Sequence, residues 1–288
     1  DARVRIWNTA LSPLSFVGEE GVKRPCSVGR TVLVAALLHG ACGPAVESPP
    51  DPPAASEIPA DAEERPPIVA SNAFYYYADV EAAWRFYADV LGFETTADYG
   101  FAKIMRVAPA SYLTLVDAAE GMHSADEPKT VTLAIVTDEV EGWYAYLTAA
   151  GVPMRGGLGE VDLEAAHVGF VVVDPEGYFL EFERFQPHPE NDRLLPLLDE
   201  LEPLYPGDGA ATTRPAQLGV RATVQWLYFR DTAATNDFYE RLLGTPPIVD
   251  QGWAWAYPLS ASGFLGVVDA KRGLHQASDD KGVTLSLI

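Results

Sequence analysis

An internal repeat constrains the fold of this chain more than any other feature. The segment from Asn72 to Val136 aligns without a gap on the segment from Val224 to Ile288, 152 residues further along, and about a third of the positions are identical. A gapless match of this length is typical of a duplicated structural unit. The second copy reaches Ile288 inside the strand that would open its second half. We therefore expect a truncated second domain, either a fragment or a half domain that depends on a partner, with an exposed sheet edge.

A shorter pattern occurs twice between residues 68 and 185. The aromatic segment Ile68–Tyr77 predicts a strand, Asp79 is a suitable N-cap for the helix that follows, and three short strands come next. The same order starts again at Val131. We therefore expect an α+β fold of tandem βαβββ units, with a first domain at residues 68–186, a linker at 187–218 and a partial second domain at 219–288.

A strand, a tight turn and a second strand are predicted in Val168–Phe185. The turn is Asp174–Gly177, in which Asp and Pro start the turn and Gly supplies a positive φ. In the second strand Phe179, Glu181 and Glu183 alternate with other residues and so share one face. A carboxylate in mid-strand beside an aromatic ring indicates a site, and the alternative is a solvated strand face with ordinary acidic residues.

The composition excludes several kinds of partner and site. The net charge is −21 and the hydrophobic content is 48%, which is enough for packed cores. Nucleic acid is excluded as a partner because phosphate contacts need Lys and Arg, and anionic membrane surfaces are disfavoured for the same reason. The two cysteines, Cys26 and Cys42, both precede the predicted domains. Those domains therefore have no disulfide and no thiolate metal site.

Residues 1–42 predict an upstream segment that ends in a targeting signal. A basic patch precedes the apolar run Thr31–Leu38, which is too short to span a bilayer as a helix, and small residues lead to Cys42. This pattern resembles a bacterial lipoprotein signal with a lipid anchor at Cys42, and an ordinary secretory signal is the alternative. The Pro-rich segment 43–67 predicts an extended tether. We therefore expect an exported protein of the periplasm or cell envelope.

Three motifs of the first domain occur in the order helix, helix end and turn. They are FYYYADVEAAWRFYADVLGFE at Phe74–Glu94, AAGV at Ala149–Val152 and DPEGYFLEF at Asp174–Phe182. Together they resemble the vicinal oxygen chelate superfamily, the group of glyoxalase I, bleomycin-resistance proteins, fosfomycin-resistance enzymes and extradiol dioxygenases. The resemblance implies that paired βαβββ units form a cup-shaped mixed sheet with helices outside. It leaves open whether the units pair within one chain or in a homodimer.

Enzymes of this superfamily hold a divalent metal inside the cup. The resemblance places the ligands on the first and last strand of each unit, here at Asn72, Thr114, Thr132 and Glu181, and in the second copy at Val224, Gly266 and Thr284. Only Glu181 is a strong ligand, because the other side chains are neutral, weakly basic or without a donor atom. We therefore expect no metal and no other cofactor, with a weakly held divalent ion as the less favoured alternative.

The alternation of residues along four strands is consistent with a ligand-binding cup. The inward positions are aromatic or polar, and the ligand-binding candidates among them are Asn72, Phe74, Tyr76, Tyr112, Thr114, Thr132, Phe179 and Glu181. The opposite positions are apolar and suit packing under helices: Leu113, Leu115, Leu133, Ile135, Leu180 and Phe182. An aromatic lining with few polar groups is typical of a small-molecule site.

Three histidines are candidates for the same region. His167 precedes a strand and is within reach of the cup mouth, although a locally hydrogen-bonded histidine at a strand edge is the interpretation we favour. His123 and His275 recur at the same place in both copies, which indicates a repeated structural contact rather than a catalytic group.

The leading functional hypothesis is metal-free binding of a small molecule with apolar and cationic character. The first alternative is a lyase or isomerase in which Glu181 acts as a general base or as the ligand of a weakly held divalent metal. The second alternative is a degenerate, structural pair of domains whose cup is filled by side chains.

Overall fold

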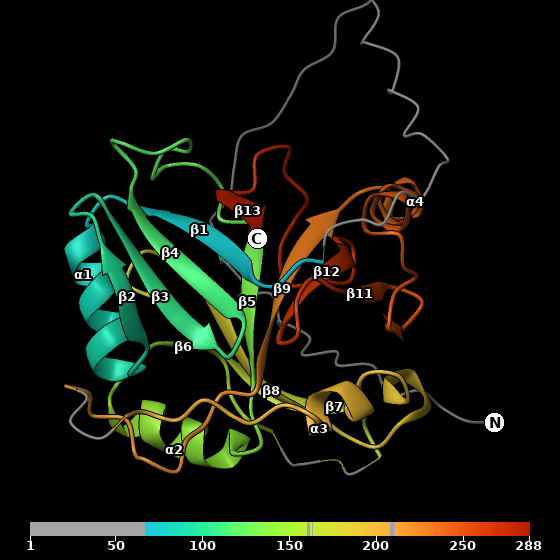
Figure 1. The fold of residues 1–288 in the computed structure, drawn as a ribbon, viewed down its shortest axis with the longest axis horizontal. Coiled ribbons are helices and arrows are strands. Elements are labelled where there is room, and N and C mark those ends of the chain that lie inside the picture. Colours follow the sequence, from blue (N-terminus) through green and yellow to red (C-terminus); the bar gives the residue numbers. More distant parts are fainter. Residues whose placement is uncertain (1–66, 160–161, 163, 208–210) are drawn as a thin grey trace, which may run out of the picture. The chain divides into compact units, whose positions relative to one another are not determined.

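The computed structural model describes residues 67–159, 162, 164–207 and 211–288. The predicted upstream segment, the signal with Cys42 and nearly all of the predicted tether lie outside the described residues. No helix in the described part of the chain is long and apolar enough to cross a membrane. The described chain folds into two mixed sheets with few helices, which confirms the expected α+β class (Figure 1).

The first unit has the expected order of one strand, one helix and three strands. Asp79 caps the helix, because its carboxylate accepts the N–H of Ala82 at 2.9 Å. The helix ends in a π-helical turn before Gly92, whose φ of 69° fits the left-handed conformation common after helices. The elements are β1 (Ser71–Tyr77), α1 (Val80–Arg85), η1 (Phe86–Val90), β2 (Glu94–Asp98), β3 (Ala102–Ala108) and β4 (Ser111–Asp117).

The second unit repeats this order and is followed by the linker. Its elements are β5 (Val131–Val136), α2 (Val140–Ala149), β6 (Met154–Gly156), β7 (His167–Val173) and β8 (Phe179–Phe185). The short strand β6 is not indicated by the sequence pattern. The linker contains two short helices, η2 (Pro189–Asn191) and α3 (Leu195–Asp199).

The third unit corresponds to the first, as the sequence repeat predicts. Its helix begins after Asp231, whose carboxylate accepts the N–H of Ala234 at 3.0 Å, and it ends at Gly244 with a φ of 70°. The elements are β9 (Ala222–Phe229), α4 (Thr232–Leu243), β10 (Val249–Asp250), β11 (Ala254–Pro258) and β12 (Gly263–Asp269). The strand β13 (Val283–Leu287) then opens a fourth unit.

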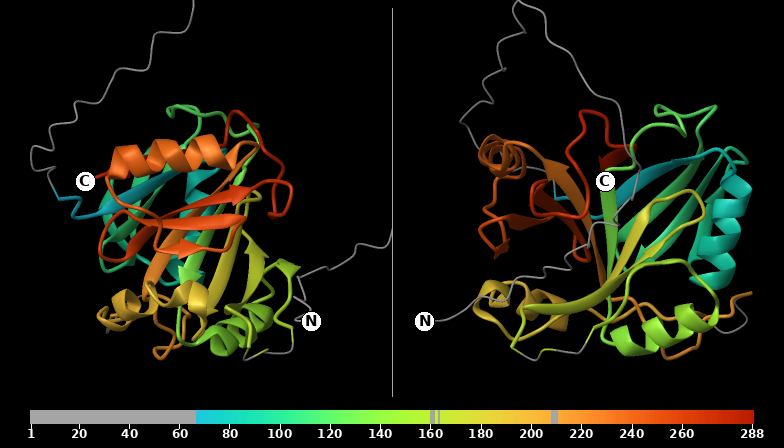
Figure 2. Two further views of the ribbon diagram at one scale, coloured as in Figure 1. Left: turned by 90° about the vertical axis from the view of Figure 1, so that its right-hand side faces the viewer. Right: turned by 180° about the vertical axis from the view of Figure 1, so that it is seen from behind.

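The units pair differently from the expectation. One sheet has the order β13-β1-β4-β3-β2 and the other has the order β10-β11-β12-β9-β5-β8-β7-β6 (Figures 1 and 2). Strand β5 pairs antiparallel with β9, and β1 pairs antiparallel with β13. The second unit therefore shares its sheet with the third, and the expectation that the first and second units form one cup is wrong. The domain boundaries drawn from the sequence stay a prediction.

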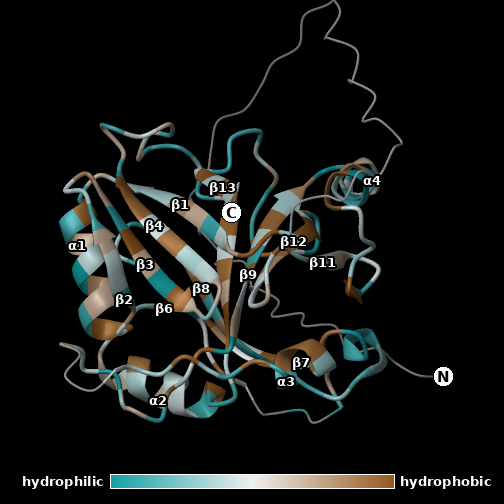
Figure 3. Ribbon diagram, in the orientation of Figure 1, coloured by the Kyte–Doolittle hydropathy of each residue, from teal (hydrophilic) through white to brown (hydrophobic). Residues whose placement is uncertain are grey.

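One apolar core contains residues of both sheets and of the helices. The six residues predicted to pack under helices are all fully buried in it: Leu113, Leu115, Leu133, Ile135, Leu180 and Phe182. The helical segments α1, η1 and α2 bury residues such as Ala83, Tyr87 and Trp143 in the same core, whereas α4 buries none. Figure 3 shows the resulting alternation of hydrophobic and paler bands along β3 and β4. Period-two patterning thus places the apolar faces as predicted.

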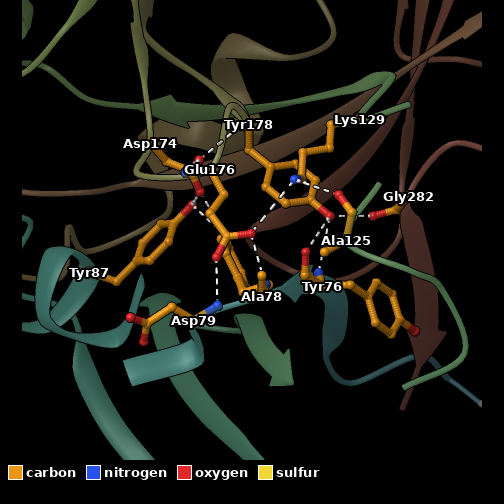
Figure 4. Close-up of polar contacts among 11 residues, drawn as sticks. Tyr76, Ala78, Asp79, Tyr87, Ala125, Lys129, Asp174, Glu176, Tyr178 and Gly282 are labelled. Carbon is orange, nitrogen blue, oxygen red and sulfur yellow. Dashed lines mark hydrogen bonds and ion pairs between the residues drawn. The ribbon is translucent and has the colours of Figure 1, made fainter. Parts of the chain in front are cut away.

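The turn between β7 and β8 attaches the second unit to the first (Figure 4). The Glu176 carboxylate accepts the backbone N–H groups of Ala78 and Asp79 at 2.8 and 2.7 Å, next to the start of α1. The buried carboxylate of Asp174 accepts the hydroxyl of Tyr77 at 2.8 Å. The acidic residues of this turn therefore serve a contact between units.

Tyr178 extends this contact to a third segment (Figure 4). Its hydroxyl donates to the carbonyl of Gly282 at 2.6 Å and accepts the N–H of Tyr76 at 3.0 Å. Its ring stacks on that of Tyr75, with 4.1 Å between the ring centroids. The side chain thus connects the residue before β8 with β1 and with the residue that precedes β13.

Candidate functional site

The eight predicted ligand-binding residues lie on two different sheets. The five-stranded sheet carries Asn72, Phe74, Tyr76, Tyr112 and Thr114, and the eight-stranded sheet carries Thr132, Phe179 and Glu181. The eight residues therefore do not share one sheet, and their role in ligand binding stays a prediction. Their separation follows from the pairing of units, since β1 lies beside β13 and not beside β5.

The polar residues of the five-stranded group hydrogen-bond to one another. Asn72 Nδ2 donates to Thr114 Oγ1 at 2.8 Å, and both side chains are buried. The Tyr76 hydroxyl and Thr284 Oγ1 of β13 are 2.8 Å apart. These groups have partners within the fold, so they offer little to a ligand.

The same tyrosine–threonine contact recurs in the other sheet. The Tyr228 hydroxyl lies 2.8 Å from Thr132 Oγ1, and these two residues are the repeat equivalents of Tyr76 and Thr284. His275 packs edge-on against Tyr228, as His123 does against Tyr76, with 4.9 Å between centroids in both cases. The interpretation of the recurring histidines as structural contacts is confirmed by these ring contacts.

One side of the eight-stranded sheet carries Thr132, Glu181, Val224 and Gly266. We call this side the inner face. The half of it that belongs to the third unit is filled by an indole ring: a Cβ atom added to Gly266 would lie 1.9 Å from Trp226 Cε3. The neighbouring side chains are apolar and buried in a second core: Val224, Phe264 and Val268. This half of the inner face is packed rather than open.

The linker helix α3 covers another part of the inner face. Leu194 and Leu198 are buried in the second core together with Phe185 at the end of β8. This part of the linker therefore packs against a face of the sheet.

A carboxylate pair and a histidine lie on the half of the inner face that belongs to the second unit. Glu181 and Glu183 lie on β8, and His167 starts the neighbouring strand β7. One ligand atom of each of the three side chains lies within 4.8 Å of the other two. Glu183 is 2% exposed, whereas Glu181 and His167 are partly buried. Solvent is thus excluded from Glu183 but reaches the side chains of Glu181 and His167.

Burial changes the proton affinities of all three groups. It raises the pKa of Glu181 to about 7. It also raises the pKa of Glu183 well above the ordinary range. The charge of Glu181 raises this pKa further, and a hydrogen bond from Trp226 lowers it. Burial lowers the pKa of His167, which favours the neutral imidazole. Two like charges in a desolvated site are unfavourable unless a proton or another cation neutralises one of them.

No counter-ion for this pair is present in the described part of the chain. The ion pairs formed there by Lys and Arg involve other carboxylates. In addition, Glu183 Oε1 is buried without a hydrogen-bond partner. An orphaned buried carboxylate oxygen is costly, so it is a feature that calls for an explanation.

Gly169 provides the space for this cluster. It lies opposite Glu183 in the register of β7 and β8, two residues after His167. A Cβ atom at position 169 would lie 2.7 Å from the carbonyl oxygen of Phe182 and 3.2 Å from Glu183 Cβ. A larger residue would therefore displace the strand that carries both carboxylates.

The sequence indicated part of this cluster. Alternation placed Glu181 and Glu183 on one face correctly, and His167 was considered but not selected. The importance of Glu183 and Gly169 depends on the register between β7 and β8, in which Gly169 faces Glu183. A one-residue shift of that register would point His167 away from the carboxylates, and the sequence alone does not exclude such a shift.

Phe179 lies at the partly exposed end of the inner face. Its ring stacks on His275 at 4.4 Å between centroids, and the guanidinium of Arg155 lies 5.7 Å from its centroid. This end therefore combines aromatic surface with a positive charge.

A hollow of about 290 Å³ lies elsewhere, next to β13. Its lining includes His123, Leu285 and the loop Asp279–Lys281. None of the eight predicted ligand-binding residues lines it. It is therefore separate from the carboxylate cluster.

Residues 70–182 match the model of the Glyoxalase/Bleomycin resistance protein/Dioxygenase superfamily. This segment is similar to the glyoxalase superfamily. The match covers the first unit and nearly all of the second, ending within β8. The expectation drawn from the three motifs is thereby confirmed for this part of the chain.

Solved structures to which this chain is similar include three bacterial examples. A lactoylglutathione lyase from Agrobacterium tumefaciens is 22% identical, with a TM-score of 0.35, over 42% of this chain and 96% of its own. A glyoxalase/bleomycin resistance protein/dioxygenase from Nocardioides is 22% identical, with a TM-score of 0.36, over 43% and 85%. A virulence protein from Salmonella typhimurium is 21% identical, with a TM-score of 0.33, over 39% and 92%. No curated protein matches this chain.

The glyoxalase superfamily implies a divalent metal, but its ligand positions do not fit one here. In the eight-stranded sheet these positions are Thr132, Glu181, Val224 and Gly266. The hydroxyl of Thr132 is bonded to Tyr228, Val224 has no donor atom, and the indole of Trp226 occupies the space at Gly266. A metal therefore has one suitable ligand, Glu181, at the superfamily positions of this sheet.

Proposed function

We propose that the inner face binds a small ligand that carries a positive charge, with Glu181 and Glu183 as its main contacts. The observation that carries this proposal is the pair of neighbouring carboxylates, desolvated and without a Lys or Arg partner in the described residues. A bound cation offsets the repulsion between two such carboxylates more effectively than a neutral ligand does.

The surroundings leave the two carboxylates as the groups that attract the cation. Phe179 lies two residues before Glu181 on the same face, but its ring already stacks on His275 and lies near the guanidinium of Arg155. Glu181 is the accessible member of the pair and would make the first contact.

A thermal-shift experiment with simple cations tests the proposal. The purified chain is heated with benzylammonium chloride or MnCl₂, and with benzyl alcohol or NaCl at matched ionic strength as controls. At least one of the two cations should raise the Tm in a concentration-dependent way, because a ligand of the folded state stabilises it. Glu181→Gln should abolish the shift, and Glu200→Gln, which changes an exposed carboxylate, should leave it intact. If neither cation raises the Tm above NaCl, the face does not bind cations and the filled, structural cup is the better description.

A lyase or isomerase is the second candidate function. It is favoured by the unequal burial of the two carboxylates, because Glu181 is accessible to a substrate while Glu183 is sealed behind it. Such an arrangement suits a carboxylate that removes a proton from a bound molecule. The reaction named for the Agrobacterium structure supplies a first assay, with lactoylglutathione as the compound followed and Glu181→Gln as the inactive control.

We further propose that the chain is exported by a bacterium and anchored through a lipid on Cys42. The support is the apolar run followed by small residues and Cys42. Metabolic labelling with a radioactive fatty acid tests this in cells that express the full-length gene. Label in the wild type that is lost in Cys42→Ser supports the anchor, and an unlabelled, secreted protein contradicts it.

A further inference from the structure

We infer that His167, Glu181 and Glu183 together bind one divalent transition-metal ion such as Zn²⁺ or Mn²⁺. The inference rests on the proposed function, because it identifies the cation that binds to the carboxylate pair. It assigns the ion to one face of the β7–β8 hairpin rather than to the first and last strands of two units.

The geometry of the three side chains is close to that of a coordination sphere. Their ligand atoms lie within 4.8 Å of one another. Ligand bonds to zinc are about 2.0–2.2 Å for nitrogen and oxygen, so two ligands of one ion are at most about 4.4 Å apart. Side-chain rotations that move each atom by a few tenths of an ångström would bring the three atoms to that distance.

The donor set also suits such an ion. One imidazole nitrogen and two carboxylates are ligands that zinc, manganese and iron accept. Two carboxylates balance a charge of +2, whereas one proton on the pair leaves a net charge of −1. The neutral form of His167, which its burial favours, is the form that binds metals.

The Glu183 oxygen that lacks a hydrogen-bond partner indicates that the ligand at this site is small. Glu183 is 2% exposed and its Oε1 has no hydrogen-bond partner. Packed side chains of the second core, such as Trp226, lie beside it. A metal ion is small enough to contact this buried oxygen directly.

Gly169 is the residue that makes this cluster compatible with the sheet. Its missing side chain leaves the space between His167 and the strand that carries both carboxylates. The metal positions known from the superfamily resemblance contribute only Glu181 to this set. His167 and Glu183 therefore lie outside the positions that the resemblance implies.

The test measures metal content and affinity directly. The full chain is purified, stripped with EDTA, and titrated calorimetrically with ZnCl₂ or MnCl₂ alone, and its metal content is measured by mass spectrometry before stripping. We expect about one ion per chain and an affinity at least about tenfold lower in His167→Gln and Glu183→Gln. The matched control is His188→Gln, a histidine in the linker outside the cluster, which should bind as the wild type does.

Folding of the variants is checked independently by far-UV circular dichroism. Glu183→Gln preserves size and removes one of two repelling charges, so it should fold even if His167→Gln does not. Equal metal affinity in the wild type and in Glu183→Gln would overturn the inference, as would a wild type that binds no metal. Stabilisation by benzylammonium without any metal binding would preserve the proposed function and contradict only the metal site. If neither probe binds, both are wrong and a proton shared by the carboxylates explains the pair.

Discussion

At the scale of single residues, alternation along the strands determines most of the site. Leu133, Leu180 and Phe182 are fully buried on one side, and Glu181 and Glu183 share the other, as the sequence predicts. This succeeds because side chains of a strand point to opposite faces whatever the partner strand is. The alternation does not show which aromatic ring packs into which space on the inner face.

Gly266→Ala tests the filling of the inner face by Trp226. The added methyl group meets the indole ring, so we expect a loss of about 1–3 kcal/mol in the free energy of unfolding, measured by chemical denaturation. Gly156→Ala is the matched control, because nothing lies within 4 Å of its added Cβ atom. Equal stability of Gly266→Ala and the wild type would show that the ring does not occupy this position.

His275 should make stability depend on pH. Burial, followed by the charge of Arg155, lowers the pKa of His275 to about 4, and the other groups against its ring are Phe179 and Tyr228. Between pH 6.5 and 4 the unfolded chain takes up a proton at His275 that the folded chain does not, so stability falls as the pH falls. His275→Gln should lose stability less steeply across this window than the wild type does. Parallel curves of unfolding free energy against pH would contradict this.

At the scale of elements, most of the sequence-based expectations are confirmed and the exceptions have local causes. The helix after Asp79 begins where its cap predicts, but its end is a π-helical turn, Phe86–Val90, which a period of 3.6 residues does not indicate. The strand β6 has three residues, too few to produce an apolar pattern. The turn Asp174–Gly177 was predicted correctly, whereas its contact with another unit depends on tertiary structure.

Glu176→Ala tests that contact. The carboxylate accepts two backbone N–H groups beside α1, in the manner of a helix cap, and its removal should lower the free energy of unfolding by about 1–2 kcal/mol. Glu200→Ala removes an exposed carboxylate from α3 and should change stability by less than about 0.5 kcal/mol. Equal effects of the two substitutions would mean that the turn does not stabilise the first unit.

At the scale of the whole molecule, the pairing of units is the feature that the sequence does not determine. Each unit has a first strand that requires a partner, and pairing β5 with β9 buries the same faces as pairing β5 with β1 would. The alternation of residues is identical in both arrangements. The choice depends on contacts between distant segments, such as those of Tyr178 with Tyr76 and Gly282.

Tyr178→Phe tests this arrangement. It leaves the carbonyl of Gly282 and the N–H of Tyr76 without their partner, so we expect a loss of about 1–3 kcal/mol in the free energy of unfolding. Amide hydrogen exchange in β1 and β13 should accelerate more than in the strands of the third unit. Tyr99→Phe changes a mostly exposed ring and serves as the control. Unchanged exchange in β13 would contradict the contact between these segments.

The most direct test of the central claim compares the stabilities of the wild type and Glu183→Gln without and with a cation. In EDTA the variant should be more stable than the wild type, because the wild type must either bury two repelling carboxylates or take up a proton that keeps Glu183 neutral. With MnCl₂ at about 100 times its dissociation constant, the wild type should gain about 2.7 kcal/mol and the variant much less, so that the difference shrinks or reverses. If the stabilities of the wild type and Glu183→Gln differ by the same amount in EDTA and in MnCl₂, the carboxylate pair does not bind a cation.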